Sequence, residues 1–421
     1  MKIQVRETQK PYGEVFVSGA KNSATRMMAA AMLSDEVVIL KNFPVSLVDV
    51  QHKARFMEEL GCTVDFDKDK STASLRCSEL SVGPLSSYDF PIRTTYLLAA
   101  AQLHRAGAAY FPYPGGCKLG ERKYDLHLMV WEKFGCEVVE NPDCIYVKGT
   151  LKGGVINFPI TTVGGTENAL LCSVVAKGRT TITNAYITPE IENLISLLRQ
   201  MGAQITLRGQ SCIDVIGVEA LGGATMEVIP DRIEALTWMI YAAISGGNLL
   251  IHNVPFQDLQ IPLIHLREAG VRFLQNESSV LVTSSCIDEA GIQPFEVACG
   301  THPGVISDMQ PFYVLLALFG NGRSLVIDYR YPERTKYLEE LSKFFPEAIT
   351  WNDGRISIQG PATLNPAHAV STDLRGSMAL LLAALLAGGD SIVEKSFMAL
   401  RGYDSLEDKL EKVGIFFVKS N

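Results

Sequence analysis

The stretch FMEELGCTV at residues 56–64 has the pattern of a charged amphipathic helix end, then a glycine, then the start of a strand. Glycine takes the left-handed conformation at a helix C-terminus at least cost, and the β-branched residues after it favour a strand. The pattern returns at intervals of about 70 residues. The further copies are WEKFGCEV (131–138), LLRQMGAQI (197–205), HLREAGVRF (265–273), LSKFFPEAI (341–349), where Pro346 stands near the glycine position, and KLEKVGIFF (409–417).

A second pattern accompanies the first: an apolar helix, a polar turn and a strand. Examples are AAAMLSDEVVILKN (29–42), VVAKGRTTITN (174–184), AAISGGNLLIHN (242–253) and LLAALLAGGDSIVEK (381–395). These helices are apolar nearly all round, so we expect them to be buried. Each unit therefore contains strands, one buried helix and one amphipathic helix.

Six such units in two groups of three predict an α/β protein with two similar domains, each a threefold repeat with its apolar helices inside a wrapping of sheets. A solenoid is the alternative arrangement. A period of about 70 residues exceeds the usual solenoid repeat of about 20–50 residues, which favours two closed domains. The length of 421 residues also fits two domains.

The composition is that of a well-buried globular enzyme, with 47% hydrophobic and 20% charged residues. The net charge of −8 and the lack of like-charge runs make nucleic acid a poor candidate partner. The start, MKIQVRETQK, has no apolar signal core. The longest apolar stretch, Met378 to Ala387, is too short to span a membrane. We therefore expect a cytoplasmic enzyme that acts on small molecules, without a membrane partner.

The cysteines predict neither a metal site nor a disulfide framework, because they are odd in number and scattered, with no CxxC pair. They are Cys62, Cys77, Cys117, Cys136, Cys144, Cys172, Cys212, Cys286 and Cys299. Reduced thiols are the expectation. Neither a metal nor an organic cofactor is expected.

Equivalent polar residues precede or begin the six buried helices. They are Lys21-Asn22, Arg93-Thr94, Thr166-Glu167, Arg232 with Glu234, Asp308 with Gln310, and Arg375 with Ser377. Helix N-termini favour anions, so a cation there is locally unfavourable unless something negative is bound. In a threefold domain these positions should meet at one end, where helix ends and cations together form an anion receptor. The alternative is that each arginine pairs with a nearby carboxylate, for which Asp231, Glu234 and Asp373 are available.

The loop PYPGGCKLGERKYDLH at residues 112–127 is the expected location of the chemistry. Cys117 is followed by Lys118 and lies near Arg122, and cations favour the reactive thiolate. The alternative is a small buried hydrophobe, which suits Cys62, Cys136 and Cys172 better. His127 is a candidate second acid or base, with a structural or capping role as its alternative.

The sequence resembles the enolpyruvyltransferase family along its whole length and in collinear order. The matching motifs are GAKN (19–22), PGGCKLGER (114–122), VGGTEN (163–168), IPDRIEA (229–235), SDMQ (307–310), TDLR (372–375) and RGYDSLEDKL (401–410). The motifs are most similar to those of the members that use UDP-N-acetylglucosamine. The members that use shikimate phosphate have no GGC loop, so Cys117 argues against them.

The resemblance implies two inside-out, barrel-like α/β domains, each with threefold repeats and helices inside. It also implies boundaries: residues 21–229 would form the domain that carries the cysteine loop, and residues 1–20 would join residues 230–421 in the other. The implied reaction adds an acceptor hydroxyl to phosphoenolpyruvate and then eliminates phosphate. The implied partners are phosphoenolpyruvate and a nucleotide or nucleotide sugar, and the acceptor group is the 3-hydroxyl of UDP-N-acetylglucosamine.

The resemblance also implies roles for single residues. Cys117 would be the general acid, and Asp308 the base beside the acceptor hydroxyl, with a helix N-cap as its alternative or additional role. The cations implied for phosphoenolpyruvate are Lys21, Arg122 and Arg401 at the phosphate, Arg334 and Arg375 at the carboxylate, and Arg93 near the loop. The residues implied for the acceptor are Asn22, Arg93, Lys123, Tyr124, Asp125, Leu126, Thr162, Val163, Gly164, Asp308 and Arg330.

Two departures from the family pattern concern the acceptor. Lys123-Tyr124 replace a proline and an aliphatic residue of the uracil-binding segment, and Arg330 replaces an apolar residue before YPER (331–334). A paralogue that uses UMP or another nucleotide in specialised metabolism is therefore an alternative. A non-catalytic nucleotide-sugar binding protein is another, but it would need neither Cys117 nor Asp308.

Overall fold

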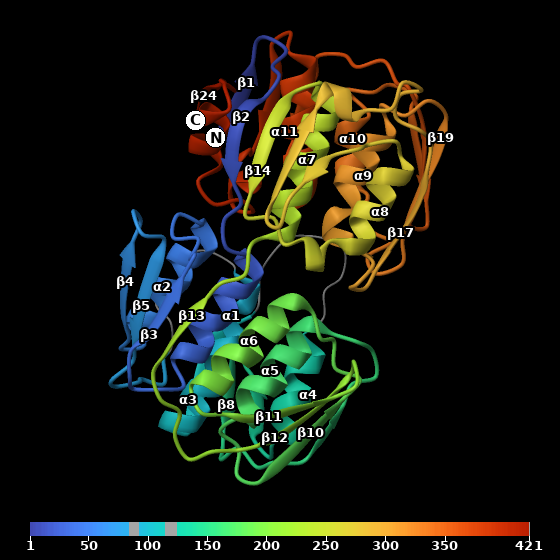
Figure 1. Ribbon diagram of the computed structural model, residues 1–421. Helices are drawn as coiled ribbons and strands as arrows, with labels where there is room; N and C mark the ends of the chain where they lie inside the picture. Colours follow the sequence, from blue (N-terminus) through green and yellow to red (C-terminus); the bar gives the residue numbers. More distant parts are fainter. Residues whose placement is uncertain (84–91, 114–123, 421) are drawn as a thin grey trace. The chain divides into compact units, whose positions relative to one another are not determined.

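The computed structural model describes residues 1–83, 92–113 and 124–420. The described chain forms two compact units (Figure 1). Residues 1–18 and 230–420 form one, called here the carboxyl unit. The described residues between 19 and 229 form the other, called here the amino unit. Each unit has its own hydrophobic core.

The amino unit contains three sheets that enclose its helices. The first has the order β13 (Ala224–Glu227), β3 (Val38–Lys41), β5 (Thr72–Arg76), β4 (Thr63–Asp67). The second has the order β11 (Gln204–Arg208), β12 (Cys212–Ile216), β10 (Arg179–Thr183), β9 (Val155–Asn157). The third has the order β6 (Ala108–Pro112), β8 (Cys144–Lys148), β7 (Glu137–Glu140).

Two kinds of helix alternate in the amino unit, as the repeat predicts. The largely buried segments are α1 (Lys21–Ala31), η1 (Arg93–Leu98) with its continuation α3 (Ala99–Ala106), and α5 (Val163–Ser173). The helices with one buried and one exposed face are α2 (Val48–Glu59), α4 (Asp125–Lys133) and α6 (Pro189–Gln200).

The carboxyl unit repeats this plan with three sheets. The first has the order β22 (His368–Val370), β23 (Ser391–Glu394), β1 (Lys2–Val5), β24 (Val418–Ser420). The second has the order β15 (Leu274–Gln275), β16 (Ser279–Thr283), β14 (Asn248–His252), β2 (Tyr12–Phe16). The third has the order β18 (Val305–Ile306), β17 (Glu296–Gly300), β19 (Arg323–Asp328), β21 (Arg355–Gln359), β20 (Ile349–Asn352).

Three apolar helices fill the centre of the carboxyl unit (Figure 1). They are α7 (Arg232–Ser245), α9 (Gln310–Ala317) and α11 (Leu374–Ala387). Every residue of α7 and α9 is buried. Burying one large aliphatic or aromatic side chain contributes about 1.5–3 kcal/mol, so these helices hold the sheets around them. The remaining helices are α8 (Gln260–Glu268), α10 (Lys336–Leu341), α12 (Phe397–Leu400), α13 (Leu406–Lys412), η2 (Phe256–Asp258), η3 (Ser284–Cys286) and η4 (Ser307–Met309).

The recurring glycine has the backbone conformation that the sequence predicts. Gly61 follows α2 with a φ of 100°, and the corresponding glycines of four other repeats also have positive φ. In the fifth repeat, which lacks the glycine, Glu347 takes a φ of 62°. The end of this helix therefore requires a residue in the left-handed conformation. In the fifth repeat that residue is Glu347, which adopts this conformation at a higher energetic cost than glycine.

Two strands are exchanged between repeats that lie far apart in the sequence. Strand β2 precedes α1 in the chain but pairs in parallel with β14. Strand β13 precedes α7 but pairs in parallel with β3. This exchange is why the first 18 residues belong to the carboxyl unit.

The expectation of nine reduced cysteines is wrong at one pair. Cys62 and Cys77 form a disulfide, with their Cα atoms 4.0 Å apart. They flank paired strands, β4 and β5, in which Thr63 lies opposite Arg76. Sequence spacing gave no sign of this pairing, because strand register brings the two residues together. Cys136 and Cys172 are buried free thiols, as expected of small hydrophobes.

Within the described residues, no helix is both long enough and apolar enough to cross a membrane.

Candidate active site

Three equivalent helix starts meet in the carboxyl unit. Arg375 lies at the start of α11, and its guanidinium reaches towards carboxylates from the other two positions. Its Nη2 is 4.0 Å from Asp231 Oδ2, and its Nε is 3.9 Å from Asp308 Oδ2. The prediction that the repeat gathers these positions is confirmed for this unit.

Arg334 is the centre of this cluster. It is only 3% exposed, and it lies between β19 and α10. Its Nη1 donates to Ser307 O at 2.6 Å and Asp308 Oδ1 at 2.9 Å, and its Nη2 donates to Asp373 Oδ1 at 2.9 Å. Burial acts to lower the pKa of Arg334, but the charges of Asp373 and Asp308 outweigh it and raise that pKa. Arg334 is therefore a permanent cation.

Arg375 is held from several sides. It donates to Gly402 O at 3.1 Å and lies over the Tyr403 ring, 5.0 Å from the centroid. Burial acts to lower its pKa, and the interactions with Tyr403, Asp231 and Asp308 raise it overall. These contacts place the RGYD segment, with the buried Arg401, against the start of α11.

The cations at the helix starts have carboxylate partners within the protein. The alternative prediction, in which each arginine pairs with a nearby carboxylate, therefore describes much of the cluster. Asp231 caps α7 by accepting from Ile233 N at 2.8 Å and Glu234 N at 3.1 Å. Asp373 caps α11 and pairs with Arg334. The third proposed partner, Glu234, pairs instead with Lys409.

Asp308 differs from these buried carboxylates in its access to solvent. Its side chain is 31% exposed, against 4% for Asp373 and 7% for Asp231. The suggested N-cap role is not seen, because neither η4 nor α9 has a side-chain cap hydrogen bond. Asp308 is therefore a solvent-accessible carboxylate oriented by two buried guanidinium groups. That geometry suits a base that must reach a bound hydroxyl.

Arg330 lies in the same loop as Arg334. The carboxylate of Asp328 accepts from the backbone N–H groups of Arg330 and Tyr331 at 2.9 and 2.8 Å, which fixes the turn. The Arg330 guanidinium lies 5.7 Å from the centre of the Tyr331 ring. The side chain is half-buried.

In the amino unit, Lys21 is the first residue of α1, and its Nζ pairs with Asp49 Oδ2 at 2.7 Å. Its neighbour Asn22 accepts a hydrogen bond at its backbone oxygen from Arg26. The predicted helix start is confirmed. The predicted need for an external anion is met here by a carboxylate from helix α2.

Arg93 begins η1, close to the buried His127 of α4. His127 packs on the Tyr96 ring with centroids 3.6 Å apart. Burial, and then the charge of Arg93, lower the pKa of His127 to about 3. His127 is therefore neutral at physiological pH, which favours the structural role over that of a protonated acid.

The segments predicted to contact the acceptor lie at the starts of two helices that pack together, α4 and α5. Thr162 is the N-cap of α5 and accepts from Gly165 N at 3.2 Å. A Cβ at Gly164 would lie 3.0 Å from Tyr96 Oη and 3.2 Å from His127 Nε2, so any larger residue here would press against both side chains. Asp125 and Leu126 are the first two residues of α4. The next residue of that helix is His127, whose ring lies close to Gly164.

Tyr124 precedes α4, and its hydroxyl donates to Glu140 at 2.8 Å. This hydrogen bond is the largest of the effects that raise the pKa of Tyr124 to about 12. The ring packs against Tyr113 with centroids 5.5 Å apart. Cys117, Arg122 and Lys123 lie outside the described residues.

A family model described as EPSP synthase (3-phosphoshikimate 1-carboxyvinyltransferase) matches residues 5–410. The chain belongs to this family. It is a member of the enolpyruvyl (1-carboxyvinyl) transferases, as the motifs indicate.

Two relatives named UDP-N-acetylglucosamine 1-carboxyvinyltransferase match almost the whole chain. The protein from Koribacter versatilis (strain Ellin345) is 36% identical over 418 residues, covering 98% of this chain and 95% of the relative. The protein from Wolbachia pipientis wMel is 33% identical over 422 residues, covering 98% of each.

Solved structures confirm the fold class. The enolpyruvyl transferase NikO from Streptomyces tendae has a TM-score of 0.89 at 24% identity, covering 100% of this chain and 98% of that one. EPSP synthase from Acinetobacter baumannii has a TM-score of 0.78 at 15% identity, covering 100% of both chains. At these identities the likeness concerns the fold alone.

Sequence reasoning missed two residues that contact the predicted site residues. Asp49, the partner of Lys21, lies on α2, which the pattern assigns to the amphipathic class. Tyr403 lies within a recognised motif, but its contact with Arg375 was not predicted. A signal for Asp49 was present, because it is a buried charge next to Val50 on the apolar face of α2.

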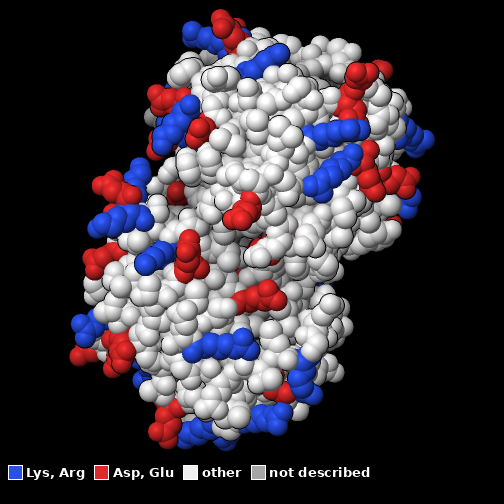
Figure 2. Space-filling view, in the orientation of Figure 1, with Lys and Arg blue, Asp and Glu red and all other residues white. Residues whose placement is uncertain are grey.

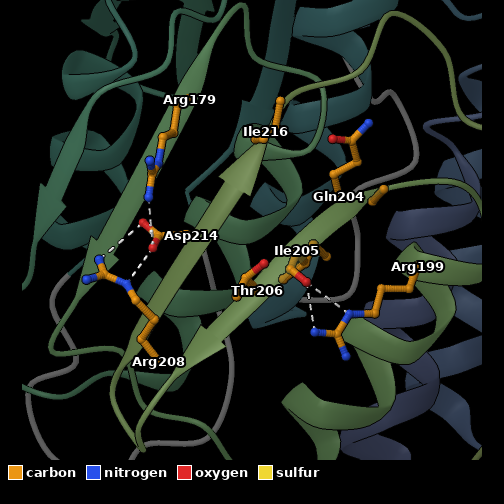
Figure 3. A pocket seen from close by; sticks show the side chains of 9 residues that line it. Arg179, Arg199, Gln204, Ile205, Thr206, Arg208, Asp214 and Ile216 are labelled. Atoms are coloured by element: carbon orange, nitrogen blue, oxygen red, sulfur yellow. Dashed lines mark hydrogen bonds and ion pairs between the residues drawn. The ribbon is translucent and has the colours of Figure 1, made fainter.

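An open depression of about 650 Å³ on the amino unit is separate from these residues (Figure 3). It lies over strands β10, β11 and β12. Arg179 and Arg208 both pair with Asp214, and Arg199 donates to Ile205 O at 2.8 Å. The pKa of Asp214 is lowered by its hydrogen bonds to Thr181, Arg208 and Arg179. The arginines here tie neighbouring strands and the adjacent helix together.

On the face drawn in Figure 2, lysine and arginine are interspersed with aspartate and glutamate, without a broad basic area among the described residues shown. Among the described residues, no group of three or more His, Cys, Asp or Glu side chains is placed to hold a metal ion.

Proposed function

We propose that this protein transfers the enolpyruvyl group of phosphoenolpyruvate to the 3-hydroxyl of UDP-N-acetylglucosamine, with release of phosphate. The observation that carries the proposal is the match, over almost the whole chain, to relatives named for this activity. The reaction is the first committed step of peptidoglycan synthesis. Both substrates are cytoplasmic metabolites, so we place the enzyme in the cytoplasm.

The reaction has an addition step and an elimination step. In the addition, the acceptor oxygen bonds to C2 of phosphoenolpyruvate, a base takes the hydroxyl proton, and an acid protonates C3. In the elimination, C3 loses a proton and the C2–O bond to phosphate breaks. Each step needs a positioned acid or base and cations at the phosphate and carboxylate.

Asp308 is the proposed base. Its exposure and its two arginine contacts support this role, because they fix the carboxylate while leaving it open to a ligand. The proposed phosphoenolpyruvate cations on the same unit are Arg334, Arg375 and Arg401, all of them buried. A planar guanidinium can bind a carboxylate through two parallel hydrogen bonds. Their fixed positions reduce the entropy lost on binding.

The amino unit supplies the remaining proposed groups. Lys21 and Arg93 would bind the donor, with Arg122 from the cysteine loop. Asn22 and two further segments would contact the acceptor: residues 123–126, which include Tyr124, and residues 162–164. Support for the acceptor site comes from the packing of α4 on α5 and from the close approach at Gly164. We propose the two units as the two domains of the enzyme.

A second candidate acceptor is UMP or another nucleotide without the sugar. The half-buried Arg330 favours it, because a cation replaces the apolar contact expected beside the sugar. Tyr124 also replaces the aliphatic residue expected in the segment proposed to contact uracil, and its hydroxyl donates a hydrogen bond to Glu140.

Phosphate release measured against a panel of acceptors distinguishes these functions. With phosphoenolpyruvate present, we expect turnover with UDP-N-acetylglucosamine and little with UMP or UDP. Turnover with UMP alone would establish the second candidate. Binding of UDP-N-acetylglucosamine by calorimetry, without phosphate release under any condition, would instead indicate a non-catalytic binding protein.

Cys117 is the proposed general acid, and fosfomycin tests it. We expect this mimic of phosphoenolpyruvate to alkylate Cys117 and to abolish turnover. Mass spectrometry of the digested protein should locate the adduct. The Cys117→Asp variant should keep some activity and resist fosfomycin, because a carboxylic acid still supplies a proton but forms no such adduct. An adduct on another cysteine, or on none, would contradict the assignment.

A further inference from the structure

Lys53 is a buried lysine in the middle of α2. Its exposed fraction is 0%, and it is among the largest fully buried side chains of the described chain. Its Nζ donates to Thr25 O at 2.6 Å and to Thr94 O at 3.2 Å, and lies 3.5 Å from Thr94 Oγ1. Burying an ammonium group is costly unless its hydrogen bonds are made. Here they are made to backbone oxygens from two other elements.

Those two oxygens belong to the segments that carry the proposed donor cations. Thr25 is one turn after Lys21 in α1, and its hydroxyl donates to Lys21 O at 3.2 Å. Thr94 directly follows Arg93 at the start of η1. Lys53 therefore joins α1, one turn after Lys21, to the first turn of η1.

Helix α2 makes a second contact with the same region. Asp49 lies one turn before Lys53, so both side chains project from one face of the helix. Asp49 pairs with the Lys21 ammonium at 2.7 Å. One face of α2 thus fixes the side chain of Lys21 and the backbone beside both Lys21 and Arg93.

Charged groups from two other helices lie next to Lys53. Arg26 of α1 and Glu167 of α5 form a buried ion pair next to it. Burial and the charge of Arg26 lower the pKa of Lys53 to about 7, against a smaller opposing effect of Glu167. Burial raises the pKa of Glu167, and Glu190 of α6 adds to that increase. A lysine at this position therefore lowers the stability of the folded protein.

We propose that Lys53 is a positioning residue, which sets the spacing between Lys21 and Arg93 so that both can bind the phosphoenolpyruvate anion. This inference rests on the proposed function. No metal or further ligand is needed at Lys53. Its effect on turnover passes through the two cations, since a displacement of about 1 Å in such groups can cost about 10²-fold in rate.

The test compares Lys53→Met in the full-length protein with Lys70→Met. Methionine has a similar length but no donor, and Lys70 is an exposed lysine of the same unit that pairs with Asp67. We expect kcat/KM for phosphoenolpyruvate to fall about 10–100-fold in Lys53→Met, mainly through a higher KM. Lys70→Met should match the wild type. Values for Lys53→Met within twofold of the wild type would overturn the proposal.

A stability profile provides a second readout, which does not depend on turnover. The folded pKa of Lys53, about 7, lies below the ordinary lysine value of 10.5. Between these values the unfolded chain binds the additional proton, so this residue makes the folded state more stable as pH rises. Below pH 7 both states are protonated, and the full cost of burial is present. The gain in melting temperature between about pH 6 and about pH 9 should therefore be smaller in Lys53→Met than in the wild type.

Lys53→Gln provides a variant that keeps amide donors on a shorter side chain. It should show an intermediate KM, and it decides the matter if Lys53→Met does not fold. Wild-type protein that releases no phosphate with any acceptor would refute the proposed function. An active wild type with unchanged Lys53 variants would refute only the positioning role.

Discussion

Replacing Asp308 with asparagine should lower kcat by about 10²–10⁴-fold, the usual contribution of a positioned general base. Asparagine has nearly the same shape and can still accept a hydrogen bond from Arg334, which now donates to Asp308 Oδ1 at 2.9 Å. It cannot take a proton from the acceptor hydroxyl. Steady-state phosphate release at saturating substrates measures the loss.

The matched control is Asp353→Asn, which changes an exposed carboxylate of the same unit. Thermal unfolding of both variants should stay close to that of the wild type, because Asp308 is partly exposed and caps no helix. A kcat within tenfold of the wild type for Asp308→Asn would assign the base to another group. A large loss of stability would make Asp308 a structural residue.

Replacing Arg334 with methionine should destabilise the carboxyl unit by about 3–5 kcal/mol, the usual cost of removing one member of a buried ion pair. The substitution leaves Asp373 buried without its guanidinium partner and removes the cation that orients Asp308. For a unit of this size, the midpoint of thermal unfolding should fall on the order of 10 °C. Calorimetry measures the shift.

A second substitution separates stability from binding. Asp373→Asn removes the unpaired charge but keeps the oxygen that accepts from Arg375 N and Gly376 N at 3.2 Å. The double variant Arg334→Met with Asp373→Asn should regain much of the lost stability, because the two residues are coupled. Its KM for phosphoenolpyruvate should stay high, since the cation proposed to bind the carboxylate is absent. Arg323→Met, at an exposed arginine of β19, should change neither property.

Recovery of both stability and KM in the double variant would show that Arg334 acts only through the fold. A single Arg334→Met variant as stable as the wild type would contradict the buried ion pair itself.

Local pattern was sufficient to predict the repeat and its elements. The glycine that follows the amphipathic helix in five of the six repeats takes positive φ, as at Gly61, because no other residue ends a helix there at so little cost. The all-round apolar helices α7, α9 and α11 are buried, because such surfaces have no stable place in water. Equal spacing of the helix starts also predicted that the segments at Arg232, Asp308 and Arg375 would meet, and Arg375 lies near Asp308 and near Asp231, the residue before Arg232.

Pairings between distant segments could not be predicted in the same way. The disulfide between Cys62 and Cys77 depends on the register of β4 and β5. The exchange of β2 and β13 depends on which sheet has an edge open to a parallel strand. The register between two strands and the presence of an unpaired sheet edge cannot be read from the sequence of a single segment.

By itself, the sequence determined the α/β class, the sixfold repeat and the buried helices, because each follows from side-chain chemistry at a fixed spacing. Its motifs indicated the reaction class through their resemblance to a known family. Only the tertiary structure decided which charges neutralise one another. Arg334 pairs with both Asp308 and Asp373, and Lys53 joins α1 to η1. The physical reason is that the energy of a buried charge depends on the few ångströms around it, and side chains from several repeats share that space.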